Sequence, residues 1–309
     1  MRAMLPSDRP FTLFAPNTTL VIEPQAGCVA TSWLVENRER LVLPQPREQF
    51  LQTMRTGGIP LLYPYANRLR WDHFTVAGRE VNLSRDSNLK RDNNQLPMHG
   101  LLLRWNAWRV ERLSESCATA TLVWNQHPAL MQVWPFAHIL RLQWQLSSEG
   151  NDTMLVITTT IEADGGMDVP AAWGWHPYFL VQPDTPIHLP PRARINLDAR
   201  GLPVLPIDHG ATLPACEIQA CRNADDLFVL ENPAKAHAMV QASGQAMRIE
   251  CDQSYSHMQV YSPLPEAMTK SFACIEPMMA ATSAICDDTA KIVLAGQTLQ
   301  SHFTLHLTL

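Results

Sequence analysis

Short stretches in which apolar and polar residues alternate recur from one end of the chain to the other. Residues 138–146 read HILRLQWQL and residues 302–309 read HFTLHLTL, with an apolar residue at every second position. Successive side chains of a β-strand point to opposite faces, so this period of two predicts strands with one buried face. The 24 prolines among 309 residues disfavour long helices. The sequence therefore predicts an all-β protein, a large antiparallel β-sandwich of two packed sheets.

Other segments extend this pattern. Residues 73–83 (HFTVAGREVNL) predict two strands joined by a tight turn at Ala77-Gly78. Further strands are expected at 118–124, 153–162, 247–251, 257–261 and 291–294. Only short helical turns are expected, at 252–258, at 262–271 and from Glu276-Pro277 onward, and 183–191 (PDTPIHLPP) is interpreted as a surface loop. No repeat and no linker divides the chain, so residues 1–309 are expected to form a single domain.

Composition narrows the classes of partner. The formal net charge is −5 and no polybasic run occurs, which argues against a nucleic-acid or anionic-membrane partner. No apolar run approaches the roughly 18–20 residues of a membrane span, and the N-terminus lacks the apolar core of a signal peptide. The seven cysteines are odd in number and without CxxC spacing, as in reduced cytosolic proteins. We expect a cytoplasmic monomer or homodimer.

Two polar segments precede the middle of the chain. Asn67-Arg68 closes the run GGIPLLYPYANRLR (57–70), and the arginine fork suits a hydroxyl or carboxylate ligand. The alternative is a surface arginine paired with a neighbouring acid. His99 precedes Gly100 in LPMHGLLLRW (96–105), where glycine permits close approach of the backbone to a ligand. A lone His-Gly is nevertheless a weak signal.

Two further segments carry titratable groups in apolar surroundings. His176 lies in AAWGWHPYFLVQP (171–183), and it is either a satisfied core histidine or an acid/base in a sugar pocket. Glu276 lies in ACIEPMM (273–279), where desolvation raises a carboxyl pKa in the direction a general base needs. The aromatic neighbours Trp173, Trp175 and Tyr178 are candidates for walls against sugar C–H groups, or for ordinary core packing.

A fifth segment, RNADDLFVL (222–230), places two aspartates at the start of a strand. The chain resembles the aldose 1-epimerase (galactose mutarotase-like) family over roughly residues 20–305. The resemblance is carried by five short motifs in this order: Asn-Arg, His-Gly, His-Pro-Tyr-Phe, Asp before Phe, and Glu-Pro. The Ile275-Glu276-Pro277 match is the most specific. The resemblance implies a large antiparallel β-sandwich that binds a sugar and interconverts the α and β anomers of an aldose, with no cofactor and no metal.

The resemblance also implies roles for individual residues. Glu276 matches the general base that removes the proton from the C1 hydroxyl, and His176 matches the general acid that protonates the ring oxygen. The positions that hold sugar oxygens are matched by Asn67, Arg68, His99 and Asp225, with Asp226 as the neighbouring alternative to Asp225.

Four other interpretations stay open at this point. Some relatives act on hexose 6-phosphates, for which Arg68, Arg70 and Arg104 are candidate phosphate ligands. A non-catalytic sugar-binding protein is also consistent with the fold, although the presence of both Glu276 and His176 argues against it. A glycoside hydrolase or lyase would need two carboxylates, and only Glu276 with Asp225 qualifies. A metal site formed by His99, His176, Asp225 and Glu276 is the fourth alternative, because these residue types bind metal ions. No close spacing of these residues in the sequence supports it.

Overall fold

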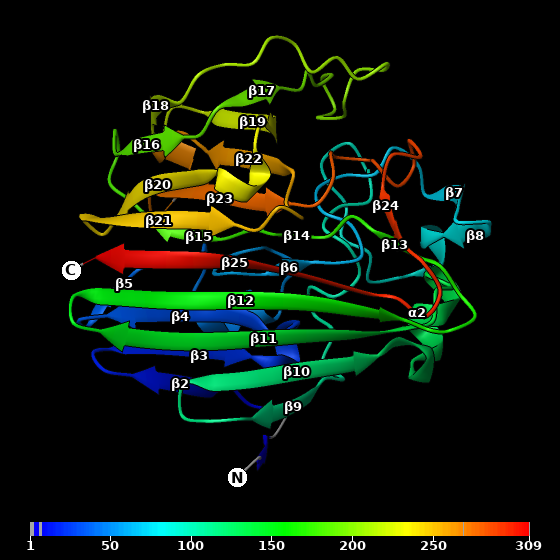
Figure 1. The fold of residues 1–309 in the computed structure, drawn as a ribbon, viewed down its shortest axis with the longest axis horizontal. Coiled ribbons are helices and arrows are strands. Elements are labelled where there is room, and N and C mark those ends of the chain that lie inside the picture. The colour runs from blue at the N-terminus through cyan, green and yellow to red at the C-terminus, as the bar shows by residue number, and fades with distance from the viewer. Residues whose placement is uncertain (1–2, 6–7, 268, 309) are drawn as a thin grey trace.

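In the computed structural model, a layer of long strands that lie side by side packs against a second layer of shorter strands (Figure 1). The structure describes residues 3–5, 8–267 and 269–308. Every pairing between strands of its sheets is antiparallel. This arrangement confirms the predicted antiparallel β-sandwich.

The first layer is a ten-stranded sheet built around the long central strands β11, β12 and β25. Across the sheet the order is β1 (Ala3–Leu5), β9 (Arg109–Arg112), β10 (Cys117–Val123), β11 (His138–Glu149), β12 (Asp152–Ala163), β25 (Thr298–Thr308), β21 (Gln245–Cys251), β20 (His237–Ala242), β16 (Pro186–Leu189) and β18 (Cys216–Gln219). The C-terminal strand β25 pairs with β12 and β21, which joins distant parts of the chain in one sheet.

The second layer contains a seven-stranded and a four-stranded sheet. The seven-stranded sheet runs β17 (Arg192–Arg194), β19 (Ala224–Leu230), β22 (His257–Ser262), β23 (Phe272–Met278), β14 (Gly174–Trp175) and β6 (Leu61–Leu62), with β15 (Tyr178–Leu180) also on β23. The four-stranded sheet runs β2 (Phe11–Ala15), β3 (Thr18–Glu23), β4 (Val29–Val35) and β5 (Arg38–Glu39). Two further sheets have two strands each. In one, β13 (Val169–Ala171) pairs with β24 (Lys291–Val293), which lies far from it in the sequence. In the other, β7 (His73–Val76) and β8 (Arg79–Asn82) form a hairpin.

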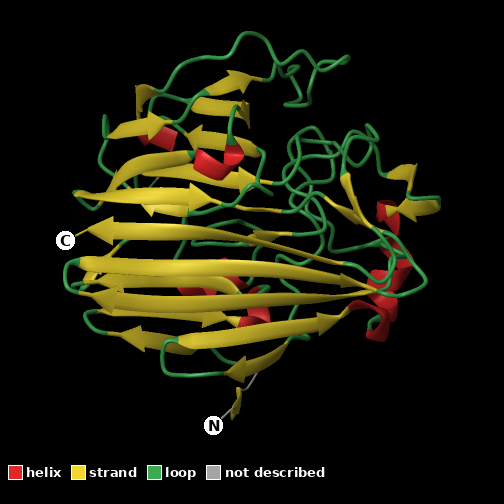
Figure 2. Cartoon of the chain, in the orientation of Figure 1, coloured by secondary structure: helices red, strands yellow, loops and turns green. Residues whose placement is uncertain are grey.

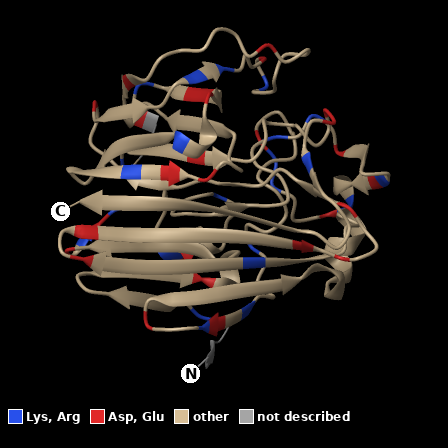
Figure 3. Cartoon of the chain, in the orientation of Figure 1, with Lys and Arg blue, Asp and Glu red and all other residues tan. Residues whose placement is uncertain are grey.

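Helices are short and lie mainly at the ends of strands (Figure 2). They are α1 (Arg47–Leu51), α2 (Pro128–Val133) and the 3₁₀ turns η1 (Pro24–Ala26), η2 (Leu83–Arg85), η3 (Trp124–Gln126), η4 (Pro233–Lys235) and η5 (Pro265–Ala267). Within the described ranges, none of these helices has the length and apolarity needed to cross a membrane. Basic and acidic positions are interspersed over the ribbon (Figure 3), in keeping with the absence of a polybasic run in the sequence.

Most of the expected strands are confirmed, including the strand–turn–strand at 73–83. Two predictions were wrong. Residues 186–189, expected in a surface loop, form strand β16 because Ile187 and Leu189 lie on either side of the exposed His188 and become buried. Glu276-Pro277, expected to start a helical turn, lies inside strand β23, where cross-strand pairing with β22 outweighs the local signal of the proline.

The two faces of the seven-stranded sheet have different environments. On β23, Ala273 and Ile275 join the main core between the layers, whereas Cys274 and Met278 belong to smaller clusters on the other face. Because the side-chain period of a strand is two, Glu276 lies on the same face as Cys274 and Met278. Glu276 therefore projects from the outward face of this sheet, away from the main core.

Candidate active site

Strand register brings His176 and Glu276 together. Gly174 of β14 pairs with Met278, and Tyr178 of β15 pairs with Cys274. The same register extended over the intervening gap places His176 opposite Glu276. Pro177 has no N–H to donate, which accounts for the break between β14 and β15 at this point. The proline thus marks the place where the sheet pairing opens beside the histidine.

The other side of β23 supplies a second polar row. Gln259 on β22 lies directly opposite Glu276, and Asp225 on β19 pairs with Tyr261. The Gln259 side chain donates from Nε2 to Asp225 Oδ1 at 2.6 Å and accepts from Asn67 Nδ2 at 3.3 Å. The sequence analysis did not identify Gln259. A polar residue between the apolar Met258 and Val260 of a predicted strand could have marked it as a candidate pocket residue.

Strand alternation also separates the two candidate aspartates. Asp225 projects to the outward face and lines the pocket with Glu276. Asp226 projects the other way, at the edge of the sandwich, and pairs with Arg194. Of the two neighbouring alternatives, the structure therefore brings Asp225, and not Asp226, to the other candidate residues.

Two loops complete the site. Asn67 and His99 both adopt left-handed backbone conformations, with φ of 54° and 63°, and the His99 N–H donates to the Asn67 carbonyl at 2.8 Å. The Arg68 guanidinium donates to Asp92 Oδ2 at 2.8 Å and to Asn67 Oδ1 at 3.0 Å. Arg68 is therefore both paired with a neighbouring acid and part of the pocket.

Gly100 holds these loops together by packing on backbone. Its φ is +74°, and a Cβ at this position would lie 2.1 Å from the Tyr63 carbonyl oxygen. The close approach expected of this glycine is real, but its partner is the chain itself and not a ligand. The Leu101 N–H also donates to Tyr63 O at 2.7 Å, so 63–68 and 98–101 form one connected unit.

Gly100→Ala is expected to lower the free energy of unfolding by at least about 3 kcal/mol, because it adds a backbone clash to the strain of a positive φ. Gly78 offers a matched control, since its φ is +71° and a Cβ there would meet nothing within 4 Å. Gly78→Ala should cost about 1 kcal/mol, from backbone strain alone. Urea unfolding of the three proteins measures both values, and equal losses in the two variants would contradict the packing argument.

All six candidate residues line one pocket of about 270 Å³. The set comprises Asn67, Arg68, His99, His176, Asp225 and Glu276. The pocket is also lined by Thr56, Lys90, Met98, Tyr178, Gln259 and Tyr261. Thr56 and Lys90 come from irregular segments without hydrophobic periodicity, so the sequence offered no signal for them.

The centre of the pocket is a buried His–Glu pair. His176 Nε2 lies 3.4 Å from Glu276 Oε1, and the two side chains are 5% and 3% exposed. Burial lowers the pKa of His176 to about 3, helped by the positive charge of Lys90. Burial, together with the charge of Asp225, raises the pKa of Glu276 well above its usual range. The pair therefore favours an uncharged state that holds one proton over an ion pair.

Tyr178 supports the imidazole from its other side. Its ring stacks on that of His176 with a centroid separation of 4.5 Å and an angle of 13° between planes. The phenol oxygen lies 3.3 Å from His176 Nε2 and 2.7 Å from Thr56 Oγ1. Of the two alternatives left open for the aromatic neighbours, ordinary core packing applies to Trp173 and Trp175, which are fully buried in the main core. Tyr178 lines the pocket.

The three arginines considered for a phosphate do not converge. Arg70 pairs with Asp287 at 3.2 Å and donates to the Pro203 carbonyl at 2.8 Å. Arg104 donates to three backbone carbonyls, those of Phe50, Arg55 and Leu103. Of these three arginines, Arg68 alone belongs to the residues that line the candidate pocket.

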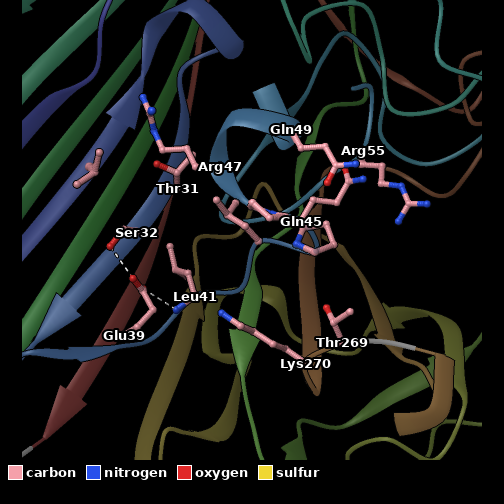
Figure 4. Close-up of a pocket in the computed structure, with 14 residues that line it drawn as sticks. Thr31, Ser32, Glu39, Leu41, Gln45, Arg47, Gln49, Arg55, Thr269 and Lys270 are labelled. Atoms are coloured by element: carbon pink, nitrogen blue, oxygen red, sulfur yellow. Dashed lines mark hydrogen bonds between the residues drawn. The ribbon is translucent and has the colours of Figure 1, made fainter. Parts of the chain in front are cut away.

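Two other features bear on the location of the site. A larger cavity of about 880 Å³ lies beside strand β4, with Arg47, Arg55 and Lys270 around it (Figure 4). It contains neither His176 nor Glu276, so its size does not make it the better candidate for acid/base chemistry.

Across the described part of the chain, no group of three or more His, Cys, Asp or Glu side chains is arranged to hold a metal ion.

Comparison with known proteins agrees with this fold. Residues 10–306 match the family model described as Aldose 1-epimerase. The chain belongs to the aldose 1-epimerase family. A galactose mutarotase-like protein from Clostridium acetobutylicum superposes with a TM-score of 0.78 at 14% identity, covering 100% of this chain and 99% of that one.

Two more relatives define the range of similarity. Galactose 1-epimerase from Lactobacillus acidophilus NCFM superposes with a TM-score of 0.69 at 13% identity, covering 99% of this chain and 98% of that one. The Escherichia coli K12 protein YphB is 25% identical over 177 residues, which span 57% of this chain and 54% of that protein. At these identities the structural likeness establishes the fold, and the chemistry has to be argued from the residues of the pocket.

Proposed function

We propose that this member of the aldose 1-epimerase family interconverts the α and β anomers of an aldose, with Glu276 as general base and His176 as general acid. The observation that carries the proposal is the buried contact of 3.4 Å between His176 Nε2 and Glu276 Oε1. Opening a pyranose requires removal of the proton on O1 and delivery of a proton to O5. Both oxygens are bonded to C1, so the base and the acid have to lie close to one another.

The protonation of the pair suits this reaction. A carboxyl beside a neutral imidazole holds the same number of protons as a carboxylate beside an imidazolium. The pair therefore reaches the catalytic form by moving one proton internally, without exchange with solvent. Burial opposes the charged form of the pair, whereas the polar groups of a bound sugar would favour it.

The proposed cycle uses each residue twice. The Glu276 carboxylate takes the proton from O1 while His176 delivers a proton to O5, and the C1–O5 bond breaks to give the open-chain aldehyde. Rotation about C1–C2 presents the other face of the carbonyl to O5. On closure His176 takes the proton from the C5 hydroxyl and Glu276 returns one to O1, so the enzyme is restored without a net change.

The remaining pocket residues are proposed to orient the sugar. His99 is 3% exposed, its Nδ1 has no hydrogen-bond partner among the described residues, and burial lowers its pKa well below the usual range. A buried polar atom without a partner costs free energy, which a sugar hydroxyl would relieve. Asp225 and Arg68 offer further polar atoms, and Tyr178 offers an aromatic face.

The wild-type protein is expected to accelerate mutarotation of at least one aldose dissolved as a pure anomer. Optical rotation or the anomeric proton signals would be followed for α-glucose, α-galactose and α-xylose, with the rate in buffer alone subtracted. Treatment with a chelator should leave the rate unchanged, because the proposed steps require only proton transfer. No acceleration over a wide aldose panel would rule out the proposed reaction and favour a sugar-binding protein.

A further inference from the structure

The pocket contains one cation that no acidic side chain neutralises. The Lys90 ammonium lines the pocket and donates to the Met54 carbonyl at 3.0 Å. It forms no ion pair with any Asp or Glu among the residues that the structure describes, whereas Arg68 in the same pocket pairs with Asp92. Burial, with the nearby charges of Arg104 and Arg55, lowers the pKa of Lys90 from its usual value.

Lys90 lies on the acid side of the pocket. The N–H of Met98, the residue before His99, donates to the Lys90 carbonyl at 2.9 Å. The Met54 carbonyl that accepts from Lys90 lies two residues before Thr56, whose Oγ1 is 2.7 Å from the phenol oxygen that contacts His176. The positive charge of Lys90 also lowers the pKa of His176 and of His99. In the proposed reaction His176 faces the ring oxygen O5 and Glu276 faces O1. The other neighbour of O5 is C5, which carries C6. Lys90 is therefore placed toward the C6 substituent of a bound hexose.

The number of unpaired positive side chains near the pocket limits which charged group the C6 substituent can carry. Arg70 and Arg104 are engaged elsewhere, and Arg68 is neutralised by Asp92. An arginine fork matches a phosphate with two parallel hydrogen bonds, whereas a lysine ammonium offers a single point charge. One lysine point charge is the complement of one carboxylate.

We propose that Lys90 makes the pocket selective for aldohexuronates, sugars whose C6 is a carboxylate. This inference rests on the proposed function, because it places the sugar by the roles of His176 and Glu276. A C6 carboxylate within hydrogen-bond distance of the Lys90 ammonium neutralises a partly buried charge and satisfies its free N–H groups. A neutral hexose does neither.

The test compares mutarotation of glucuronate and galacturonate with that of glucose, galactose and glucose 6-phosphate. The expected result is a kcat/KM for one uronate at least tenfold above that for its neutral counterpart and above that for glucose 6-phosphate. In Lys90→Met this selectivity should fall by roughly tenfold to hundredfold, the range for hydrogen bonds to charged groups. Lys235→Met, which removes an exposed lysine of η4, is the matched control and should keep the wild-type selectivity.

Other outcomes overturn the inference in distinct ways. Acceleration of neutral aldoses with no preference for a uronate, or equal losses for both classes in Lys90→Met, removes the role of Lys90 and leaves the proposed reaction standing. A preference for glucose 6-phosphate that Lys90→Met abolishes replaces the carboxylate with a phosphate.

A binding measurement keeps the inference testable if no aldose is accelerated. Titration calorimetry with glucuronate should give a Kd for the wild type at least tenfold lower than for Lys90→Met. Equal Kd values in the two proteins, or no binding to either, would overturn the inference independently of catalysis. Unfolding temperatures of both variants would show that the fold is retained.

Discussion

Glu276→Gln is expected to lower kcat/KM for mutarotation by roughly 10²–10⁴-fold, the contribution typical of a positioned general base. Glutamine has nearly the same size and still fills the space beside His176, but its amide cannot accept the proton from O1. The loss should appear mainly in kcat, because the residues proposed to orient the sugar stay in place. Initial rates of optical rotation at several concentrations of a fresh α-anomer measure both constants.

The same variant should be at least as stable as the wild type at neutral pH. Because burial raises the pKa of Glu276, the native state binds its proton more tightly than the unfolded state does. The free energy of unfolding then falls as the pH rises from about 4.3 through the pKa of the folded state. Glutamine does not titrate, so the difference in Tm between Glu276→Gln and wild type should shift in favour of the variant between pH 4 and pH 8.

An exposed pair provides the control for both catalytic substitutions. His188 Nε2 lies 3.3 Å from Glu217 Oε2, close to the 3.4 Å of the buried pair, but these two side chains are about half exposed. Glu217→Gln should therefore leave the rate as in the wild type. A Glu276→Gln variant that folds and keeps a rate within tenfold of wild type would remove Glu276 from the role of base.

The strands could be predicted well because alternation is a local signal. Segments such as 138–146 and 153–162 form the long central strands β11 and β12 as expected. Proline misled at 183–191 and at Glu276-Pro277. Pro186 is the first residue of β16, and Pro277 lies in β23 beside the break between β14 and β15, so the sheet tolerates the missing N–H at both positions. Whether such a segment becomes a strand depends on its partner strand, which local sequence does not reveal.

The members of the candidate site could be anticipated in part. His176 and Glu276 stand out as titratable groups in apolar segments, Asp225 is indicated by the family resemblance, and the structure places all three in one pocket. Their spacing of some 50 to 100 residues carries no geometric information, and only the register of β22, β23 and the β14–β15 gap shows how they meet. Lys90 was missed because it lies in a loop whose path is set by contacts such as the one with the Met54 carbonyl.

His176→Asn is the second substitution with a large expected effect, a loss of roughly 10²–10⁴ in kcat/KM. Asparagine can donate a hydrogen bond to O5 but cannot transfer a proton as the C1–O5 bond breaks. His188→Asn, on the exposed pair, is the matched control and should behave as wild type. A folded His176→Asn protein with wild-type kcat would show that the acid is another group.

The pH dependence of the wild-type rate tests the same assignment. An ordinary histidine and glutamate would lose the catalytic protonation state below about pH 4.3 and above about pH 6.5. Here burial lowers the pKa of His176 to about 3 and raises that of Glu276, so the pair keeps a single proton down to a lower pH. We expect kcat/KM not to fall between pH 6.5 and pH 4. A midpoint near pH 6.5 with loss of rate on the acid side would contradict the shared-proton description.

The double variant Glu276→Gln/His176→Asn distinguishes a coupled pair from two independent contributions. In the proposed reaction Glu276 takes a proton from O1 while His176 delivers one to O5, so removing either side chain would already prevent the concerted step. The double variant is therefore expected to lose little more than the worse single variant, as for residues that act as a unit. Losses that multiply, each measured against the rate in buffer, would mean that the base and the acid work in separate steps and that their 3.4 Å contact is incidental to catalysis.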